Sequence, residues 1–136
     1  MKIIWRTLAA GLTLLLVLAV VQQIAAESGE VVVLTTRDSA GVAHTTRLWI
    51  VEHQGQLYLR AGMPQSQWYQ RLLGDAQVTV ERNGTTTRYR AAPELVTVTQ
   101  INELMRAKYG WADAFIGFLF GRDASVPVRL GADEAS

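Results

Sequence analysis

The stretch GMPQSQWYQRLLGDAQVTVERNGTTTRYR, residues 62–90, decides the fold that this sequence predicts. Pro64 interrupts the strand that comes before it. Trp68 and Leu72 stand four residues apart, which indicates a short amphipathic helix, and we expect Gly74 to end that helix as its C-cap. The first half of the stretch therefore predicts a helix between two strands, and it raises the question of what Trp68 contacts.

The second half of the stretch predicts a β-hairpin. Val78 and Val80 alternate with polar residues, as in a strand with one buried face. Asn83-Gly84 follows, and this pair is the strongest short hairpin signal, because a type I′ turn needs positive φ at both central positions. We expect the return strand to continue beyond Pro93 as far as residue 98.

Three further strands precede this stretch. They are predicted over residues 30–37, 42–53 and 56–62, which are rich in β-branched and aromatic residues. The turn cluster 38–41 separates the first two, and Gln54-Gly55 separates the second from the third. Because the connections are so short, we expect an antiparallel meander.

A second helical segment and a last strand complete the predicted domain. Thr99 is the predicted N-cap of the helical segment, and Gly110 is expected to break it. The very apolar run 111–120 continues as helix. We expect this run to be buried against the sheet, with contact to a bilayer as the alternative. A strand over 126–130 follows. The sequence thus predicts an α+β fold: a small six-stranded antiparallel split β-barrel with two helical segments, preceded by an N-terminal hydrophobic helix.

Residues 1–26 form a separate N-terminal segment, and residues 27–136 form the barrel domain. The apolar stretch 3–26 is long enough to cross a bilayer, which needs about 20 such residues. We favour an uncleaved membrane anchor, with Lys2 and Arg6 in the cytoplasm and the domain on the outer, periplasmic side. The ending IAA is an imperfect cleavage site, so a secreted protein with a cleaved signal peptide is the alternative.

Composition excludes several classes of function. Of the 13 Lys and Arg residues, two precede residue 27, so the domain has 11 against 12 Asp and Glu residues and a formal net charge of −1. A nucleic-acid partner, which needs a basic stripe, is therefore not expected. Cysteine is absent, and the two His residues show no metal-ligand spacing, so we predict no metal site. We find no nucleophile motif and predict no catalytic side chain.

Two quoted segments carry a family likeness. VVVLTTRDSAGVAHTTRLWIVEHQGQLYLRAG (31–62), followed by SQWYQRLLGDAQVTVERNGTTTRYRA (66–91), resembles the flavin-binding split-barrel superfamily, nearest to its deazaflavin-dependent nitroreductase and pyridoxamine-phosphate-oxidase-like members. The chain departs from the family pattern in having Asp38 where a basic residue is common, Arg47 where Pro is frequent and Arg71 where Asn is usual. The matching positions are Thr35, Thr36, Gly41, Leu48, Trp49, Gly55, Trp68, Tyr69, Leu72, Val78 and Val80.

The resemblance implies a bound cofactor, FMN or a deazaflavin, and a homodimer with the site at its interface. Four arginines on the predicted strands and helix, at positions 37, 47, 60 and 71, could converge near one end of the barrel, where at least two of the four would bind the cofactor phosphate. The alternative is that they are ordinary exposed charges. The predicted cofactor-binding residues are Arg37, Ser39, Gly41, His44, Arg47, Gly62, Ser66, Trp68 and Arg71.

Trp68 has two possible roles. Its ring can stack on an isoalloxazine-like ring system, or it can anchor the helix to the barrel, and we favour the anchor.

The sequence leaves two candidate functions. The first is a membrane-associated oxidoreductase that uses FMN or a deazaflavin to reduce a quinone- or nitroaromatic-like acceptor. The second is a non-catalytic ligand- or cofactor-binding module of the same fold. The expected partners are the cofactor, the acceptor and the membrane, through residues 3–26.

Overall fold

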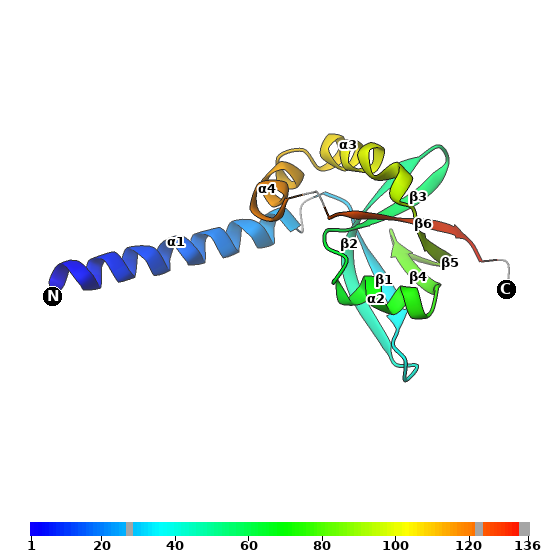
Figure 1. Ribbon diagram of the computed structural model, residues 1–136, viewed down its shortest axis with the longest axis horizontal. Coiled ribbons are helices and arrows are strands. Elements are labelled where there is room, and N and C mark those ends of the chain that lie inside the picture. The colour runs from blue at the N-terminus through cyan, green and yellow to red at the C-terminus, as the bar shows by residue number, and fades with distance from the viewer. Residues whose placement is uncertain (27–28, 122–123, 134–136) are drawn as a thin grey trace.

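Six antiparallel strands close into a barrel in the computed structural model, which describes residues 1–26, 29–121 and 124–133 (Figure 1). The order around the barrel is β1-β2-β3-β6-β5-β4, and pairing between β1 and β4 closes it. This confirms the predicted α+β barrel. The strands are β1 Val31–Arg37, β2 Ala43–His53, β3 Gln56–Ala61, β4 Gln77–Arg82, β5 Thr85–Pro93 and β6 Val126–Ala132.

Four α-helices accompany the barrel in the described part of the chain. They are α1 Lys2–Ala26, α2 Gln67–Gly74, α3 Val98–Tyr109 and α4 Trp111–Phe120, and a short 3₁₀-helix, η1 Leu95–Thr97, precedes α3. α1 projects away from the barrel, and α4 lies beside its C-terminal end (Figure 1). α2 contacts β1 and β5, whereas α3 packs on β2. The predicted boundary between 26 and 27 adjoins residues 27–28, which lie outside the described residues.

The tight turns form where the sequence predicts them. Asn83 and Gly84 have φ values of 51° and 81°, as a type I′ turn requires, and Arg82 pairs with Thr85 across the hairpin. Gly110, with φ 58°, separates α3 from α4 at the predicted position. Residues that tolerate positive φ therefore set the ends of these elements.

The barrel interior is the main core. Alternate residues of β1 point inward, so that Val32 and Leu34 are fully buried, and Trp68 and Leu72 of α2 pack into the same cluster. A second cluster lies outside the barrel, where α3 packs on Tyr58 and neighbouring residues of β2 and β3. α2 therefore packs against the barrel core, and α3 covers its outer face.

Two element ends differ from the sequence prediction. β5 ends at Pro93 instead of continuing to residue 98. The Glu94 amide still donates to the Pro127 carbonyl of β6, and the chain then turns into η1, where the Thr97 amide donates to the Glu94 carbonyl at 3.3 Å. α3 consequently begins at Val98, with Thr97 rather than Thr99 at its N-cap.

The end of α2 also differs from the prediction. Gly74 is the last helical residue and does not have a positive φ, so it is not the left-handed C-cap that we expected. Asp75 occupies the cap position with extended backbone, φ −141° and ψ 102°. The chain therefore leaves the helix already extended and needs no left-handed residue before β4.

The predicted burial of the apolar run 111–120 is wrong for one face of α4. The side chains of Trp111 and Phe118 are 58% and 86% exposed, whereas Ala112 and Asp113 are buried. The reason is that α3 already occupies the outer face of β2 and β3. Only one side of α4 then finds protein to pack against.

Candidate ligand-binding cleft

A cleft of about 640 Å³ lies between the β1–β2 turn and α2. Its volume falls within the range of small-molecule sites, roughly 300–1,000 Å³. The polar residues of the turn face one side of α2 across it. The lining residues are Arg37, Asp38, Ser39, Gly41, Gln70, Arg71, Gly74 and Asp75.

Two guanidinium groups line this cleft. Arg71 Nε donates to Thr36 Oγ1 at 2.8 Å, and Thr36 is only 1% exposed, so a buried hydroxyl fixes the orientation of the guanidinium. Arg37 Nη1 donates to the Gly41 carbonyl at 3.0 Å and is exposed. Both groups are thus held by the protein itself, and each retains planar N–H donors of the kind that suit phosphate oxygens.

The backbone amides of the β1–β2 turn are used inside the turn. Asp38 Oδ1 accepts from the amides of Ala40 at 2.9 Å and Val42 at 3.0 Å, and the Gly41 amide donates to the Asp38 carbonyl at 2.9 Å. An aspartate that binds its own turn in this way is a common turn device. These three amides are therefore not available to a ligand.

The acidic side chains balance the charge of the cleft. Asp38 Oδ2 lies 2.8 Å from His44 Nε2, and the hydrogen bond from His44 lowers the pKa of Asp38 below its ordinary value. Asp38 thus stays ionised at neutral pH, and Asp75 adds a second carboxylate. Two carboxylates face two guanidinium groups, so selective hydrogen bonds rather than net positive charge would hold an anion here.

The structure divides the other predicted site residues among different places. Arg47 and Gly62 line a smaller cleft of about 180 Å³, on the outer surface of the barrel with Trp49 and Arg60. Arg47 pairs with Val33 in register, near the start of β1, whereas the cleft arginine, Arg37, is the last residue of that strand. Because a strand is extended, Arg47 lies well back along the barrel from the large cleft.

The four arginines therefore do not converge. Arg60 is directed instead to Asp113 of α4, and both side chains of this ion pair are 6% exposed. Arg60 Nη1 also donates to Asn102 of α3 at 3.2 Å. These contacts assign Arg60 to the packing of α3 and α4 on the barrel.

Ser66 and Trp68 lie outside the lining of the large cleft. Ser66 Oγ donates to the Met63 carbonyl at 2.8 Å just before α2 begins. Trp68 is 6% exposed, and its ring meets Tyr69 edge-on with centroids 6.3 Å apart. This burial favours the anchor interpretation of Trp68 over the stacking interpretation.

Sequence reasoning missed four lining residues, Asp38, Gln70, Gly74 and Asp75. The last three stand with Arg71 at positions that share one side of a helix and its C-terminus, and this spacing is a signal that was available in the sequence. The orienting role of Thr36 was not predicted, although Thr36 is one of the residues that carry the family likeness.

The cleft fits the phosphate-bearing part of a ligand better than an aromatic ring. Two oriented guanidinium groups and the Ser39 hydroxyl are suitable donors. Among the lining residues that the structure describes, however, no aromatic side chain offers a stacking wall. The described residues also contain no group of three or more His, Asp or Glu that could hold a metal ion.

Comparison with known proteins defines the class of the fold. No protein-family model and no curated protein sequence matches this chain. Solved structures do match. A Listeria innocua protein assigned as a pyridoxamine 5′-phosphate oxidase has a TM-score of 0.56 at 16% identity, covering 87% of this chain and 91% of its own. The heme storage protein HutZ of Vibrio cholerae has a TM-score of 0.54 at 14% identity, covering 82% and 87%.

A third matching structure comes from Bacteroides thetaiotaomicron and is assigned as a 5-nitroimidazole antibiotic resistance protein. Its TM-score is 0.58 at 10% identity, over 84% of this chain and 78% of its own. At such identities the likeness shows the fold. The chain has the split-barrel fold of these proteins, as the sequence resemblance implies, and the particular ligand has to be argued from the cleft.

Proposed function

We propose that this protein is a membrane-associated oxidoreductase whose cleft holds FMN or a deazaflavin by the phosphate-bearing end of the cofactor. The observation that carries the proposal is the presence of Arg37 and Arg71 on one cleft, with Arg71 oriented by the buried Thr36. A bound flavin supplies hydride chemistry, so the chain needs no acid or base of its own. Its residues bind and orient the cofactor.

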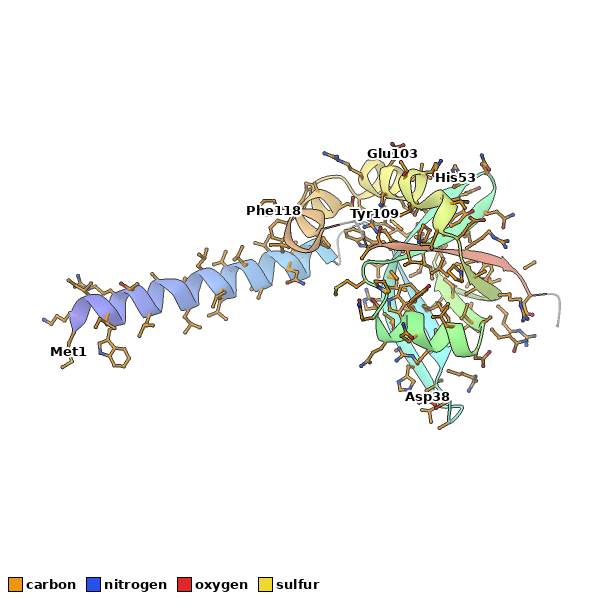
Figure 2. All side chains as sticks on the ribbon, viewed as in Figure 1. Met1, Asp38, His53, Glu103, Tyr109 and Phe118 are labelled. Carbon is orange, nitrogen blue, oxygen red and sulfur yellow. The ribbon has the colours of Figure 1, made fainter. Side chains whose placement is uncertain are left out.

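The position of the cleft bears on the acceptor, which we propose to be quinone- or nitroaromatic-like. Asp38, on the rim of the cleft, lies at the far side of the domain from Phe118 of α4 (Figure 2). α4 is the helix beside the end of α1. An acceptor would therefore reach the cleft from the aqueous phase rather than from within the bilayer.

α1 supports the membrane association. It is 25 residues long, about 38 Å at 1.5 Å per residue, and its part Lys2–Gln22 is apolar enough to cross a hydrocarbon core of about 30 Å. With Lys2 and Arg6 on the cytoplasmic side, the domain would stand on the outer side. The alternative is secretion after cleavage. The intact mass of the protein from membrane and soluble fractions distinguishes the two.

A second candidate function is a non-catalytic ligand-binding module of the same fold. It is favoured by the balanced charge of the cleft and by the burial of Trp68, which leaves no aromatic wall on the described lining. HutZ, one of the structures with this fold, is a heme storage protein. Haem is therefore included in the binding test below. The homodimer implied by the resemblance stays a prediction, which light scattering after gel filtration checks.

Binding measurements on the full chain in detergent micelles test the proposal. FMN, riboflavin, a deazaflavin and haem are titrated, and fluorescence and absorbance are followed. FMN should bind more tightly than riboflavin, which lacks the phosphate. Arg71→Ala should weaken FMN binding about tenfold or more, because a charge-assisted hydrogen bond contributes about 1.5–3 kcal/mol, and should leave riboflavin binding nearly unchanged.

Arg88→Ala is the matched control, because Arg88 is exposed on β5 and is not part of the cleft lining. If Arg37→Ala and Arg71→Ala bind FMN as tightly as Arg88→Ala does, the phosphate site is wrong. If neither flavin nor deazaflavin binds at micromolar concentration, the oxidoreductase proposal is rejected. Binding of haem alone would then support the non-catalytic module.

A further inference from the structure

α4 presents an apolar face to solvent. Trp111, Ala114 and Phe118 stand at positions i, i+3 and i+7, which share one face of a helix. Trp111 is 58% exposed and Phe118 is 86% exposed, with α1 in place. Ala114 is exposed as well. Three residues of one helix face are thus left without cover by any described part of the chain.

The face itself has no charged residue, although Ala114 and Phe118 border a cleft whose α3 side carries Glu103 and Arg106. Asp113, the single charged residue of α4, is buried against Arg60. Soluble proteins rarely expose a contiguous apolar patch on an element that also lacks charged residues, and such patches mark protein or membrane contacts. The face therefore fits an apolar partner.

The location of α4 indicates which partner. α4 packs against the C-terminal end of α1, at the edge of the domain from which α1 projects (Figure 1). The part of α1 that can cross a bilayer ends at Gln22, close to this contact. The surface of any bilayer that α1 crosses thus lies beside α4. Tryptophan is enriched at this interface, and an apolar helix face inserts about 5–10 Å into it.

We propose that α4 docks on the phospholipid bilayer that α1 crosses, with Trp111 and Phe118 in the boundary between the headgroups and the acyl chains. The inference rests on the membrane anchoring proposed above for α1. Attachment by two helices would fix the tilt of the domain on the membrane. It would also hold the cleft of Arg37 and Arg71 on the side that faces the aqueous phase.

Fluorescent labels at single cysteines test the docking, since the chain has no cysteine of its own. The full chain is reconstituted in phosphatidylcholine vesicles as Phe118→Cys, Leu15→Cys or Leu73→Cys. All three positions are exposed apolar residues, on α4, α1 and α2 respectively. Each label is quenched either by lipids brominated on their acyl chains or by aqueous iodide.

We expect bromines near the headgroup end of the chains to quench the label at 118, and deeper bromines to quench the label at 15. The label at 73 should respond to iodide alone. If the label at 15 is in lipid but the label at 118 responds to iodide like that at 73, docking is rejected and anchoring stands. If the label at 15 responds to iodide, both the docking of α4 and the anchoring by α1 are rejected. A label at 118 shielded from both quenchers would mean that protein covers α4, and this also overturns the proposal.

A second pair of variants isolates the side-chain contact. A label at Ala114→Cys reports on α4 while Phe118→Asp removes the proposed insertion. We expect this label to lose most of its bromolipid quenching in Phe118→Asp and to keep it in Leu73→Asp, the matched control. The unfolding midpoint should stay unchanged, because Phe118 is 86% exposed. Unchanged quenching in Phe118→Asp would show that Phe118 does not hold α4 on the bilayer.

Discussion

Glu30→Gln removes a carboxylate that joins three elements of the fold. Glu30 precedes β1, and its carboxylate accepts from Arg82 Nε at 2.8 Å and from Arg82 Nη2 at 3.1 Å, at the end of β4. It also accepts from Lys108 Nζ of α3 at 2.6 Å. The Glu30 side chain is 24% exposed. These bonds connect α3 to the barrel at the point where β1 begins.

The pKa of Glu30 gives the size of the effect. The hydrogen bonds from Arg82, and then from Lys108, lower this pKa from its ordinary 4.5 to about 2. One pKa unit corresponds to about 1.4 kcal/mol, so the shift sets an upper bound of about 3 kcal/mol. Arg82 and Lys108 are about a third exposed, and solvent screening reduces the expected loss to about 2 kcal/mol.

The pH dependence separates this interaction from a general loss of packing. Because the folded-state pKa is lowered, the stabilisation is fully present above pH 4.5 and disappears as the pH falls toward 2. The difference in unfolding free energy between the wild type and Glu30→Gln should therefore be largest at pH 7 and shrink below pH 4.5. At pH 7 the variant should have a Tm lower by about 8 °C.

Tryptophan fluorescence follows the denaturant and thermal unfolding of the full chain in a mild detergent. These curves give the difference in unfolding free energy between the wild type and Glu30→Gln. Trp49 is a suitable reporter, because its ring stacks on Tyr109 with centroids 4.3 Å apart. Glu81→Gln is the matched control, since Glu81 is an exposed glutamate on the same strand as Arg82. Equal stability of Glu30→Gln and Glu81→Gln at pH 7, or a difference that persists unchanged to pH 2, would refute the reasoning.

Three further predictions use the same unfolding measurement. Gly84→Ala should lower the free energy of unfolding by about 1 kcal/mol, because Gly84 has a positive φ. Gly74→Ala should raise it by up to about 1 kcal/mol, because Gly74 lies in a helix with open space at its Cβ. Changes of the same sign in the two variants would contradict this reasoning. Tyr109→Phe should lose about 1–2 kcal/mol, since the buried hydroxyl accepts from the Ile50 amide at 2.9 Å. Unchanged stability at pH 7 would refute that role. Leu34→Ala, at a fully buried position, should lower the free energy of unfolding by about 2–5 kcal/mol. A decrease below about 1 kcal/mol would show that the barrel interior is not close-packed around Leu34.

Much of the fold could be predicted from local patterns in the sequence. Alternation in β1, and the turn at Asn83-Gly84, depend on interactions between near neighbours in the chain, so a short window contains the cause. The element ends that were wrong depend on distant partners. The chain leaves β5 for η1 at Glu94, whose carboxylate accepts from the hydroxyl of Tyr58 on β3. No short window around Pro93 contains that information.

The candidate site was predictable only in part. The sequence indicated that arginine and a polar turn would form a site, and Arg37 and Arg71 do share a cleft. Arg47 and Arg60 do not join them, since strand register places Arg47 farther back along the barrel and Asp113 of α4 pairs with Arg60. Residue types can indicate the chemistry of a site, but their convergence depends on register and packing.

The sequence by itself determined that this protein has an apolar N-terminal helix followed by a six-stranded barrel, because hydrophobic periodicity and turn residues act locally. Only the tertiary structure decided which side chains remain free for a ligand or a membrane. Asp38 binds the amides of its own turn, Trp68 is buried in the barrel core, and Phe118 stays exposed because α3 already covers the barrel. Each of these outcomes results from competition between segments for the same surface, which no single segment encodes.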